Sequence, residues 1–397
     1  MGADMGAGGA ARPEASGFHQ LLIIGNGFDL ECGLRSRFID FYRPRFQMIN
    51  SITVYGKDAW EGKVQDLDLT VWDFILWGER HSQWCDIEGA IRTWVVNRKE
   101  GARGTDRIEK TVRYVKAYPF RERTYVLYMT NRLDDEIEDA EYALKNVARF
   151  VHMRLDQKRI KKVTPADVIS VLYDELRRFE KQFSSYLWRE VRVRKSYLDK
   201  ARDLFETLAT EGVDTGQVRD TSILSFNYTN PFAHLQGLGD VEVVNIHGNL
   251  DEGIIFGIDG KDCMDDAVAL PFTKTYRVAV SDIHVSKGLF HVSRRSHESS
   301  TRLIKFYGHS LREADYSYFQ SVFDAVDLYG GYTRLVFCFR PWKVQDRLVD
   351  EAEARVAMVK RVARLLNTYG NTMDNTDHGK NLMHRLILEG RLEIKRI

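Results

Sequence analysis

The segment Leu21-Leu-Ile-Ile-Gly-Asn-Gly-Phe-Asp-Leu30 constrains the fold more than any other part of the chain, because four apolar residues run directly into a glycine turn. Such a run is typical of a strand buried in a parallel sheet, and the residues after the turn have a helical pattern. A strand, a glycine turn and a helix N-terminus can bind phosphate, since backbone N–H groups approach the anion and the helix dipole favours it. The third glycine of the dinucleotide fingerprint is missing from its usual place, so the segment alone is a weak indicator.

This turn has two interpretations. In the first, backbone amides of Gly25 and Gly27 hold a pyrophosphate, and Asn26 or Asp29 touches a ribose or positions a loop. In the second, the turn is an ordinary strand–helix connection in which Asp29 caps the helix. Three further segments favour the nucleotide interpretation.

The chain has 397 residues, a formal net charge of +1 and 44% hydrophobic residues. This size and content suit one large domain or two intimate domains with a substantial core. A dedicated nucleic-acid-binding protein usually has a basic excess, so the near-neutral charge argues against that class. We interpret the basic runs at 158–162 and 192–195 as solvated helix faces and do not expect nucleic acid as a partner.

The cysteines indicate the compartment. None of Cys32, Cys85, Cys263 and Cys338 belongs to a C-x-x-C pair, so the sequence predicts neither a zinc ribbon nor a disulfide framework. This usage suits the reducing cytoplasm, and Cys338 is expected to be buried in a strand. No apolar run of about 18 residues occurs, so we expect no transmembrane helix and no membrane partner. Residues 1–18 are expected to form a disordered leader.

Short apolar runs predict the strands of a parallel sheet at 20–24, 221–226, 241–246, 302–307 and 334–339, and the alternating segment 392–397 predicts an edge strand. Between the first two strands, residues 55–210 have a helical pattern, with a helix start at Thr164-Pro165-Ala-Asp167. Six of the seven tryptophans lie in this stretch, which indicates a packed subdomain. We therefore predict an α/β fold in which residues 19–54 and 211–397 form a nucleotide-binding domain and residues 55–210 form a large all-helical insertion.

Asn227, in Ile223-Leu-Ser-Phe-Asn-Tyr-Thr-Asn230, stands just past the C-terminal end of a predicted strand. Ligands bind at this edge of open α/β sheets. A carboxamide there can orient a water and contact a sugar hydroxyl at once, because it both donates and accepts hydrogen bonds. In the alternative interpretation, Asn227 or Asn230 caps a helix that begins at Pro231, and this role fits Asn230 better.

His247, in Val243-Val-Asn-Ile-His-Gly-Asn249, also follows a predicted strand. Histidine is the side chain best suited to accept a proton near neutral pH, so its position at the same sheet edge as Asn227 makes it a candidate base. A lone histidine is more often structural, and that alternative stays open.

The fourth segment is Ile304-Lys-Phe-Tyr-Gly-His-Ser-Leu311, with Asp315 four residues later. Gly308 and Ser310 are candidates for the second half of a nucleotide cradle, in which Ser310 bonds a phosphate or a ribose. The alternative is that Ser310 only caps a helix. The sequence has no nucleophile elbow, P-loop, HExxH motif or spaced metal-ligand cluster, so we expect no metal.

These four segments, in this order, resemble the abortive-infection proteins of the AbiH family, which belongs loosely with the sirtuin-like NAD-binding enzymes. The most specific pieces are residues 25–30, 225–230, 245–248 and 308–311 with Asp315. Trp84, Asp86 and Glu88 also look family-like, without an assigned role. The resemblance implies a sirtuin-like Rossmann-type sheet carrying the helical insertion.

The resemblance also implies that NAD is the substrate or ligand. Asn227 and His247 match the Asn and His that sirtuin-like enzymes use on NAD, where they would position water and accept a proton. Protein deacylases of that group carry a four-cysteine zinc module that this chain lacks, so the closer analogue is the stand-alone NAD glycohydrolase of antiphage systems. The implied nucleotide-binding residues are Gly25, Asn26, Gly27, Phe28, Asp29, Gly308, Ser310 and Asp315.

One departure from the sirtuin pattern concerns the residues after the first helical turn. Sirtuins have a Pro-Asp-Phe-Arg run there that helps hold the cofactor, whereas this chain has Arg35-Ser-Arg-Phe38. Sirtuin-type handling of the nicotinamide end is therefore not implied by these residues.

We accordingly expect a cytoplasmic antiphage effector that hydrolyses the nicotinamide–ribose bond of NAD to nicotinamide and ADP-ribose. Its control would act through the helical insertion, by assembly into a homo-oligomer or by a phage-derived trigger. One alternative is a non-catalytic nucleotide sensor that relays its bound state to a partner. Another is a metal-independent toxin directed at nucleic acid, which only the basic runs support.

Overall fold

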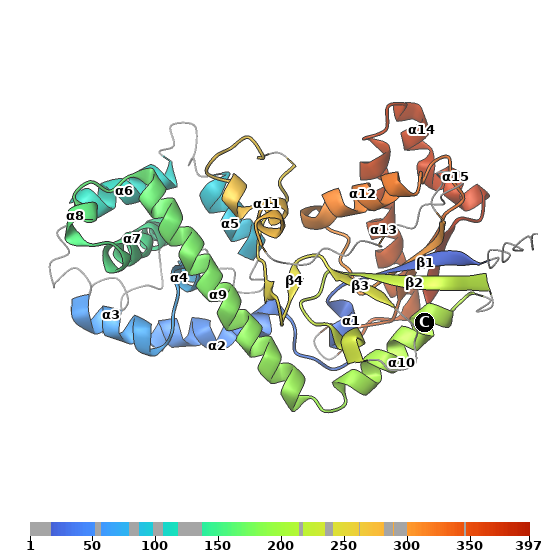
Figure 1. Cartoon of the computed structure of the whole chain (residues 1–397), viewed down its shortest axis with the longest axis horizontal. Helices are drawn as coiled ribbons and strands as arrows, with labels where there is room; N and C mark the ends of the chain where they lie inside the picture. Colours follow the sequence, from blue (N-terminus) through green and yellow to red (C-terminus); the bar gives the residue numbers. More distant parts are fainter. Residues whose placement is uncertain are drawn as a thin grey trace, which may run out of the picture.

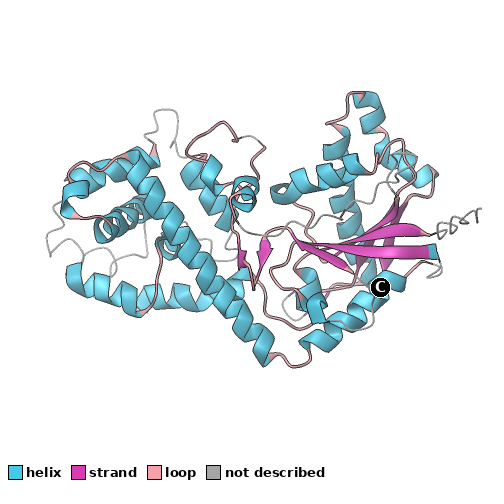
Figure 2. Cartoon of the chain, viewed as in Figure 1, coloured by secondary structure: helices cyan, strands magenta, loops and turns pink. Residues whose placement is uncertain are grey.

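The computed structural model describes residues 17–51, 57–78, 87–97, 106–117, 137–213, 217–234, 241–261, 263–281, 289, 300–344 and 347–397. A sheet lies on one side of the molecule and a helical part on the other (Figures 1 and 2). The leader predicted for residues 1–18 falls mostly outside the described residues, as do Trp84, Cys85 and Asp86.

Among the described residues, six strands pair in parallel in the order β10-β7-β6-β1-β2-β3. They are β1 (Phe18–Ile24), β2 (Val218–Ser225), β3 (Glu242–Asn245), β6 (Thr301–Tyr307), β7 (Arg334–Phe339) and β10 (Leu392–Arg396). All six predicted strands are confirmed, including the edge position of the last one. Numbered along the chain, they stand in the order 3-2-1-4-5-6, which is the order of dinucleotide-binding Rossmann sheets. The predicted α/β Rossmann-type fold is confirmed.

Helices cover both faces of this sheet, because successive side chains of a strand point to opposite faces. Leu22 and Ile24 pack with α1 (Gly27–Glu31) and α10 (Tyr197–Thr210). Leu21 and Ile23 pack in a second core with side chains from three helices on the other face. These helices are α12 (Tyr316–Ala325), α13 (Glu351–Gly370) and α15 (Leu382–Leu388), and α14 (Thr376–Lys380) lies between the last two in the chain. In Figure 1, α12 and α13 lie above the sheet and α10 below it.

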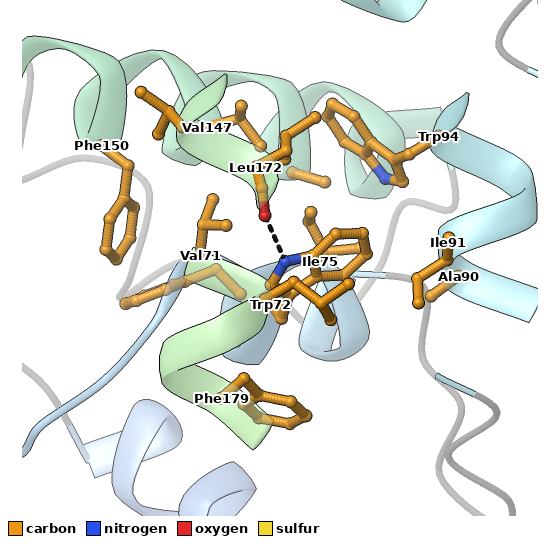
Figure 3. Packing of buried hydrophobic residues seen from close by; sticks show 14 of the residues in the cluster. Val71, Trp72, Ile75, Ala90, Ile91, Trp94, Val147, Phe150, Leu172 and Phe179 are labelled. Atoms are coloured by element: carbon orange, nitrogen blue, oxygen red, sulfur yellow. Dashed lines mark hydrogen bonds between the residues drawn. The ribbon is translucent and has the colours of Figure 1, made fainter. Parts of the chain in front are cut away.

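The chain between α1 and α10 forms the helical part. Its helices are α2 (Phe38–Ser51), α3 (Lys57–Asp66), α4 (Val71–Gly78), α5 (Ile87–Val95), α6 (Arg107–Ala117), α7 (Ile137–Arg154), α8 (Gln157–Ile160) and α9 (Pro165–Val193). Thr164 and Asp167 form a capping box at the start of α9, as the sequence predicts. Trp60, Trp72 and Trp94 are fully or almost fully buried, and the Trp72 indole donates to the Leu172 carbonyl at 2.9 Å (Figure 3).

The segment after β3 joins the two parts. It contains the short strands β4 (Gly248–Asn249) and β5 (Gly253–Ile254) and the helix α11 (Lys274–Ala279). Phe256, Ile258 and Phe272 from this segment pack into the core of the helical part. Arg277 of α11 forms a buried ion pair with Glu180 of α9. The segment thus connects the sheet edge to the centre of the helical part.

The remaining short elements are the 3-10 turns η3 (Pro231–His234), η4 (Leu270–Phe272) and η5 (Glu313–Asp315), and the hairpin of β8 (Lys343–Val344) and β9 (Arg347–Leu348). Across the described part of the chain, no helix has both the length and the apolar character needed to cross a bilayer.

Candidate functional site

A cavity of about 310 Å³ lies where the sheet meets the helical part, and we call it the sheet-edge cavity. Its volume falls at the lower end of the range of small-molecule sites, roughly 300–1,000 Å³. It opens at the carboxyl ends of β1, β2 and β6, where the strand order reverses and Rossmann sheets bind ligands. Its polar lining includes Asn26, Asp29, Glu88, Asn227, Ser310 and Asp315.

The two predicted glycine turns pack directly against each other. Gly25 N–H donates to the Tyr307 carbonyl at 3.0 Å, and Gly27 N–H donates to the Gly308 carbonyl at 2.8 Å. A Cβ atom at Gly27 would lie 2.6 Å from the Gly308 Cα atom, and Gly308 itself has φ of +71°. The glycines are therefore required for contact between the turns, and the two amides donate within the protein.

Two other residues of the first turn have separate environments. The Asn26 side chain exchanges hydrogen bonds with Ser36, and both residues line the cavity. The Phe28 amide donates to the Gly25 carbonyl at 2.9 Å, and its ring is fully buried on the sheet beside Phe232. Asn26 is therefore placed at the cavity, whereas Phe28, predicted as a nucleotide contact, is placed in the core.

Asp29 lines the cavity and is buried. Its Oδ1 atom accepts from the Tyr197 hydroxyl and its Oδ2 atom accepts from the Thr229 hydroxyl, both at 2.7 Å. Burial raises the pKa of Asp29 to about 6, although these two hydrogen bonds act in the opposite direction. The interpretation of Asp29 as a helix cap is wrong, because its carboxylate joins α1 to α10 and to the loop after β2.

Asn227 presents an unpaired carboxamide to the cavity. Its side chain is 4% exposed, and neither Nδ2 nor Oδ1 has a hydrogen-bond partner among the described residues. Its backbone is held firmly, since Asn245 Nδ2 donates to the carbonyls of Asn227 and Thr229 at 2.8 and 3.0 Å. Buried polar groups are almost always paired, so this exception indicates a missing partner such as a ligand or a water.

Asp315 is the centre of the charged network at the cavity wall. Its Oδ1 atom lies 2.7 Å from Lys274 Nζ and 3.1 Å from His247 Nε2, and its Oδ2 atom lies 3.3 Å from His309 Nε2. Burial opposes ionisation, but Lys274 and the two imidazoles hold the pKa of Asp315 well below its usual value. Asp315 is therefore a carboxylate at neutral pH, with its side chain 16% exposed at the cavity.

His247 does not line the cavity, although its neighbours Asp315 and Phe226 do. Burial, and next the charge of Lys274, lowers the pKa of His247, so the imidazole is neutral at pH 7. Because Asp315 can only accept, the proton of this neutral ring is on Nε2, and the buried Nδ1 atom has no partner among the described residues. His247 therefore contacts Asp315 behind the cavity wall and is not part of the lining itself.

Ser310 is exposed at the cavity, and the next turn of helix begins at Glu313, so Ser310 does not cap a helix. Asn230 precedes η3, but its Oδ1 atom has no partner among the described residues, so it makes no capping bond there. His309, between Gly308 and Ser310, accepts from the Leu311 amide through Nδ1 at 2.9 Å.

Two functional residues were not predicted with a role. Lys274 is 2% exposed, and its Nζ atom also lies 2.8 Å from Oε1 of Glu88, which lines the cavity from α5. Lys274 belongs to no recognisable sequence motif, because the carboxylates that it contacts are distant in sequence. The family-like segment that contains Glu88 could have directed attention to this acid. Among the described residues, no group of three or more His, Cys, Asp or Glu side chains could hold a metal ion.

Comparison with models of known protein families identifies the family to which this chain belongs. A sequence model described as "Bacteriophage abortive infection AbiH" matches residues 21–331, which include every residue that lines the sheet-edge cavity. The chain belongs to the AbiH family. Searches of curated proteins and of solved structures find no match.

Membership of the AbiH family indicates a role in the abortive infection response to bacteriophage. In this AbiH protein the matched region contains both glycine turns, the Asn227 loop, His247 and the Asp315 network. It also contains Glu88 and Lys274, which bring the helical part to the same cavity.

Proposed function

We propose that this AbiH protein binds NAD in the sheet-edge cavity and hydrolyses its nicotinamide–ribose bond as the effector step of abortive infection. The observation that carries the proposal is the buried, unpaired carboxamide of Asn227. A buried amide without partners destabilises a protein by about 1–3 kcal/mol, so a ligand that supplies partners explains why it is there. A ribose hydroxyl and an attacking water are both suitable partners, since the amide can donate to one and accept from the other.

The charge of the cavity supports a ligand with a cationic ring. Three carboxylates line it, on Asp29, Glu88 and Asp315, and the buried ammonium of Lys274 pairs with the last two. The cations of the lining itself, Arg37 and Arg312, are exposed residues. The rings of Phe183, Phe226, Tyr228 and Phe256 form much of the remaining lining. Carboxylates and aromatic faces both favour a pyridinium ring, and carboxylates also stabilise an oxocarbenium-like transition state.

The hydrolysis balances with these residues. The water oxygen forms a bond to the ribose carbon, the carbon–nitrogen bond breaks, and its electron pair neutralises the nicotinamide nitrogen. Asp29 is the better acceptor for the proton that water loses, because its pKa of about 6 is nearer to neutral than that of Asp315. Asn227 orients the water or the ribose, and the Asp315 carboxylate faces the developing positive charge. His247, expected at first to be the base, becomes a positioning residue that holds Asp315.

A turnover assay tests this proposal. Purified intact protein is incubated with NAD, with and without phage lysate as a source of trigger, and released nicotinamide and ADP-ribose are measured. We expect release by the intact chain and a loss of about a hundredfold or more in Asn227→Ala, as for other residues that orient a reacting water. Asn230→Ala is the matched control, because Asn230 lies in the same loop with an unpaired Oδ1 atom but does not line the cavity.

The outcomes separate the proposal from its alternative. Binding of NAD that depends on Asn227, with no nicotinamide released under either condition, would make the protein a nucleotide sensor. Equal turnover by the intact chain and Asn227→Ala would overturn the assignment of the cavity. The helical part, which contributes Glu88, is the place where we propose that a phage-derived trigger or self-association acts.

A further inference from the structure

We infer that Arg37 and Arg312 bind the diphosphate of the dinucleotide, in place of the amides of the glycine turn. This inference rests on the proposed function, and it assigns the phosphate subsite. It follows from the distribution of charge in the sheet-edge cavity. Asp29 is 1% exposed and the side chains of Asp315 and Glu88 are 16% and 26% exposed, whereas both arginines are exposed residues of the lining. The cavity is therefore acidic inside and basic at its mouth.

The glycine turn is poorly placed to hold a phosphate. The amides of Gly25, Gly27 and Phe28 all donate to carbonyls within the protein. The space beside Gly27 is filled by the Gly308 backbone, so the close approach that glycine permits is already taken by the other turn. A phosphate that bound to these three amides would have to displace their hydrogen bonds.

The two arginines come from two separate segments of the lining, each with a hydrogen-bonded backbone neighbour. Arg37 follows Ser36, which exchanges hydrogen bonds with Asn26. Arg312 follows Leu311, whose amide donates to His309 Nδ1 at 2.9 Å. A guanidinium is always charged and offers a planar pair of donors that matches a phosphate, so two of them suit a diphosphate.

This distribution of charge also fixes the direction in which a ligand enters. The carboxylates inside repel phosphate and attract a cationic ring, while the arginines outside do the reverse. An oxidised dinucleotide matches both ends, with the pyridinium inside and the diphosphate at the mouth. A reduced dinucleotide lacks the positive ring, and nicotinamide riboside lacks the phosphates, so each matches one end only.

Calorimetric titration of Arg37→Gln and Arg312→Gln tests the inference without relying on turnover. The probes are ADP-ribose, which carries the diphosphate, and nicotinamide riboside, which does not. We expect each substitution to lower the affinity for ADP-ribose by about tenfold or more, as for a lost charged hydrogen bond. The affinity for nicotinamide riboside should change by less than about twofold. Arg35→Gln is the matched control, because Arg35 is exposed two residues from Arg37 but does not line the cavity.

The two proposals fail in different ways. If ADP-ribose binds the intact chain and both arginine variants equally, the arginines are not the phosphate subsite, although hydrolysis of NAD can still be correct. If the arginine variants lose affinity for ADP-ribose but the intact chain never releases nicotinamide, the phosphate subsite is supported and the proposed hydrolysis is wrong. If the intact chain does not bind ADP-ribose, the phosphate subsite is overturned, and the turnover assay alone decides the hydrolysis.

Discussion

The ammonium group of Lys274 lies 2.7 Å from Oδ1 of Asp315, and the lysine side chain is only 2% exposed. The same Nζ atom contacts Glu88, and three residues later Arg277 pairs with the buried Glu180 of α9. Two buried cations on one short helix thus join the helical part to the cavity wall. Helices α5 and α9 are thus both connected to Asp315 through α11.

The first prediction concerns Lys274→Met. Removing the cation leaves Glu88 and Asp315 without the ammonium that they share, so that, among the described residues, only the two imidazoles still contact the carboxylate of Asp315. Breaking a buried pair in this way costs about 3–5 kcal/mol. We expect a lower free energy of unfolding in urea and a higher pKa for Asp315. Lys380→Met is the control, because Lys380 and its partner Asp377 are both largely exposed and should contribute little. Equal stability of Lys274→Met and the native chain would contradict the network.

The second prediction concerns pH and Asp29. Its folded pKa of about 6 lies above the unfolded value of 3.8, so the folded state holds the proton more tightly. The native chain therefore loses stability as pH rises from about 4 to 6, and this group accounts for up to about 3 kcal/mol of that loss. Above this range Asp29 causes no further change in the unfolding free energy. Asp29→Asn is neutral throughout, so its unfolding free energy relative to the native chain should rise over the same interval. Urea unfolding at pH 4.5 and 7.5 measures this, and a difference that does not change with pH would refute it.

The third prediction concerns the contact between the glycine turns. Gly27→Ala places a methyl group 2.6 Å from the Gly308 Cα atom, where only backbone could yield. We expect a loss of about 1–3 kcal/mol or more from overpacking, with weaker NAD binding because Asn26 and Ser310 flank this contact. Gly62→Ala in α3 is the matched control, since nothing lies within 4 Å of its added methyl group. It should be neutral or slightly stabilising, and a similar effect of both substitutions in thermal unfolding would show that the turn contact is unimportant.

The fourth prediction separates a functional asparagine from a structural one. Asn227→Leu replaces an unpaired buried amide by an apolar side chain of similar size, so it should be neutral or raise the unfolding free energy by about 1–2 kcal/mol. Asn245→Leu removes two hydrogen bonds to the same loop and leaves two buried carbonyls unpaired, so it should lower that free energy by about 1–3 kcal/mol or more. Destabilisation by both variants in urea would indicate that Asn227 is structural.

The strands followed from the sequence because they are short apolar or alternating runs, most of which end in Gly, Asn or His. Their order in the sheet was not predicted and comes from the structure. The position of Asn227 followed from the same rule, since the carboxyl ends of parallel strands share one edge. The role of His247 could not be predicted from the sequence. Whether a side chain lines a cavity or lies behind its wall depends on neighbours such as Asp315, which is 68 residues away. No sequence pattern indicated a role for Lys274, because its partners Glu88 and Asp315 come from the distant elements α5 and η5. The glycines were correctly placed at the strand ends, but only the structure pairs the two turns.

The binding of NAD to Asn227→Leu compared with the intact chain tests the central claim most directly. This variant is expected to be at least as stable as the native protein, so lost binding cannot be attributed to unfolding. We predict that calorimetry detects NAD binding to the intact chain, and that Asn227→Leu weakens it by about tenfold or more while Asn230→Leu does not. Equal affinity of NAD for the intact chain and Asn227→Leu, or no NAD binding to the intact chain, would contradict the account.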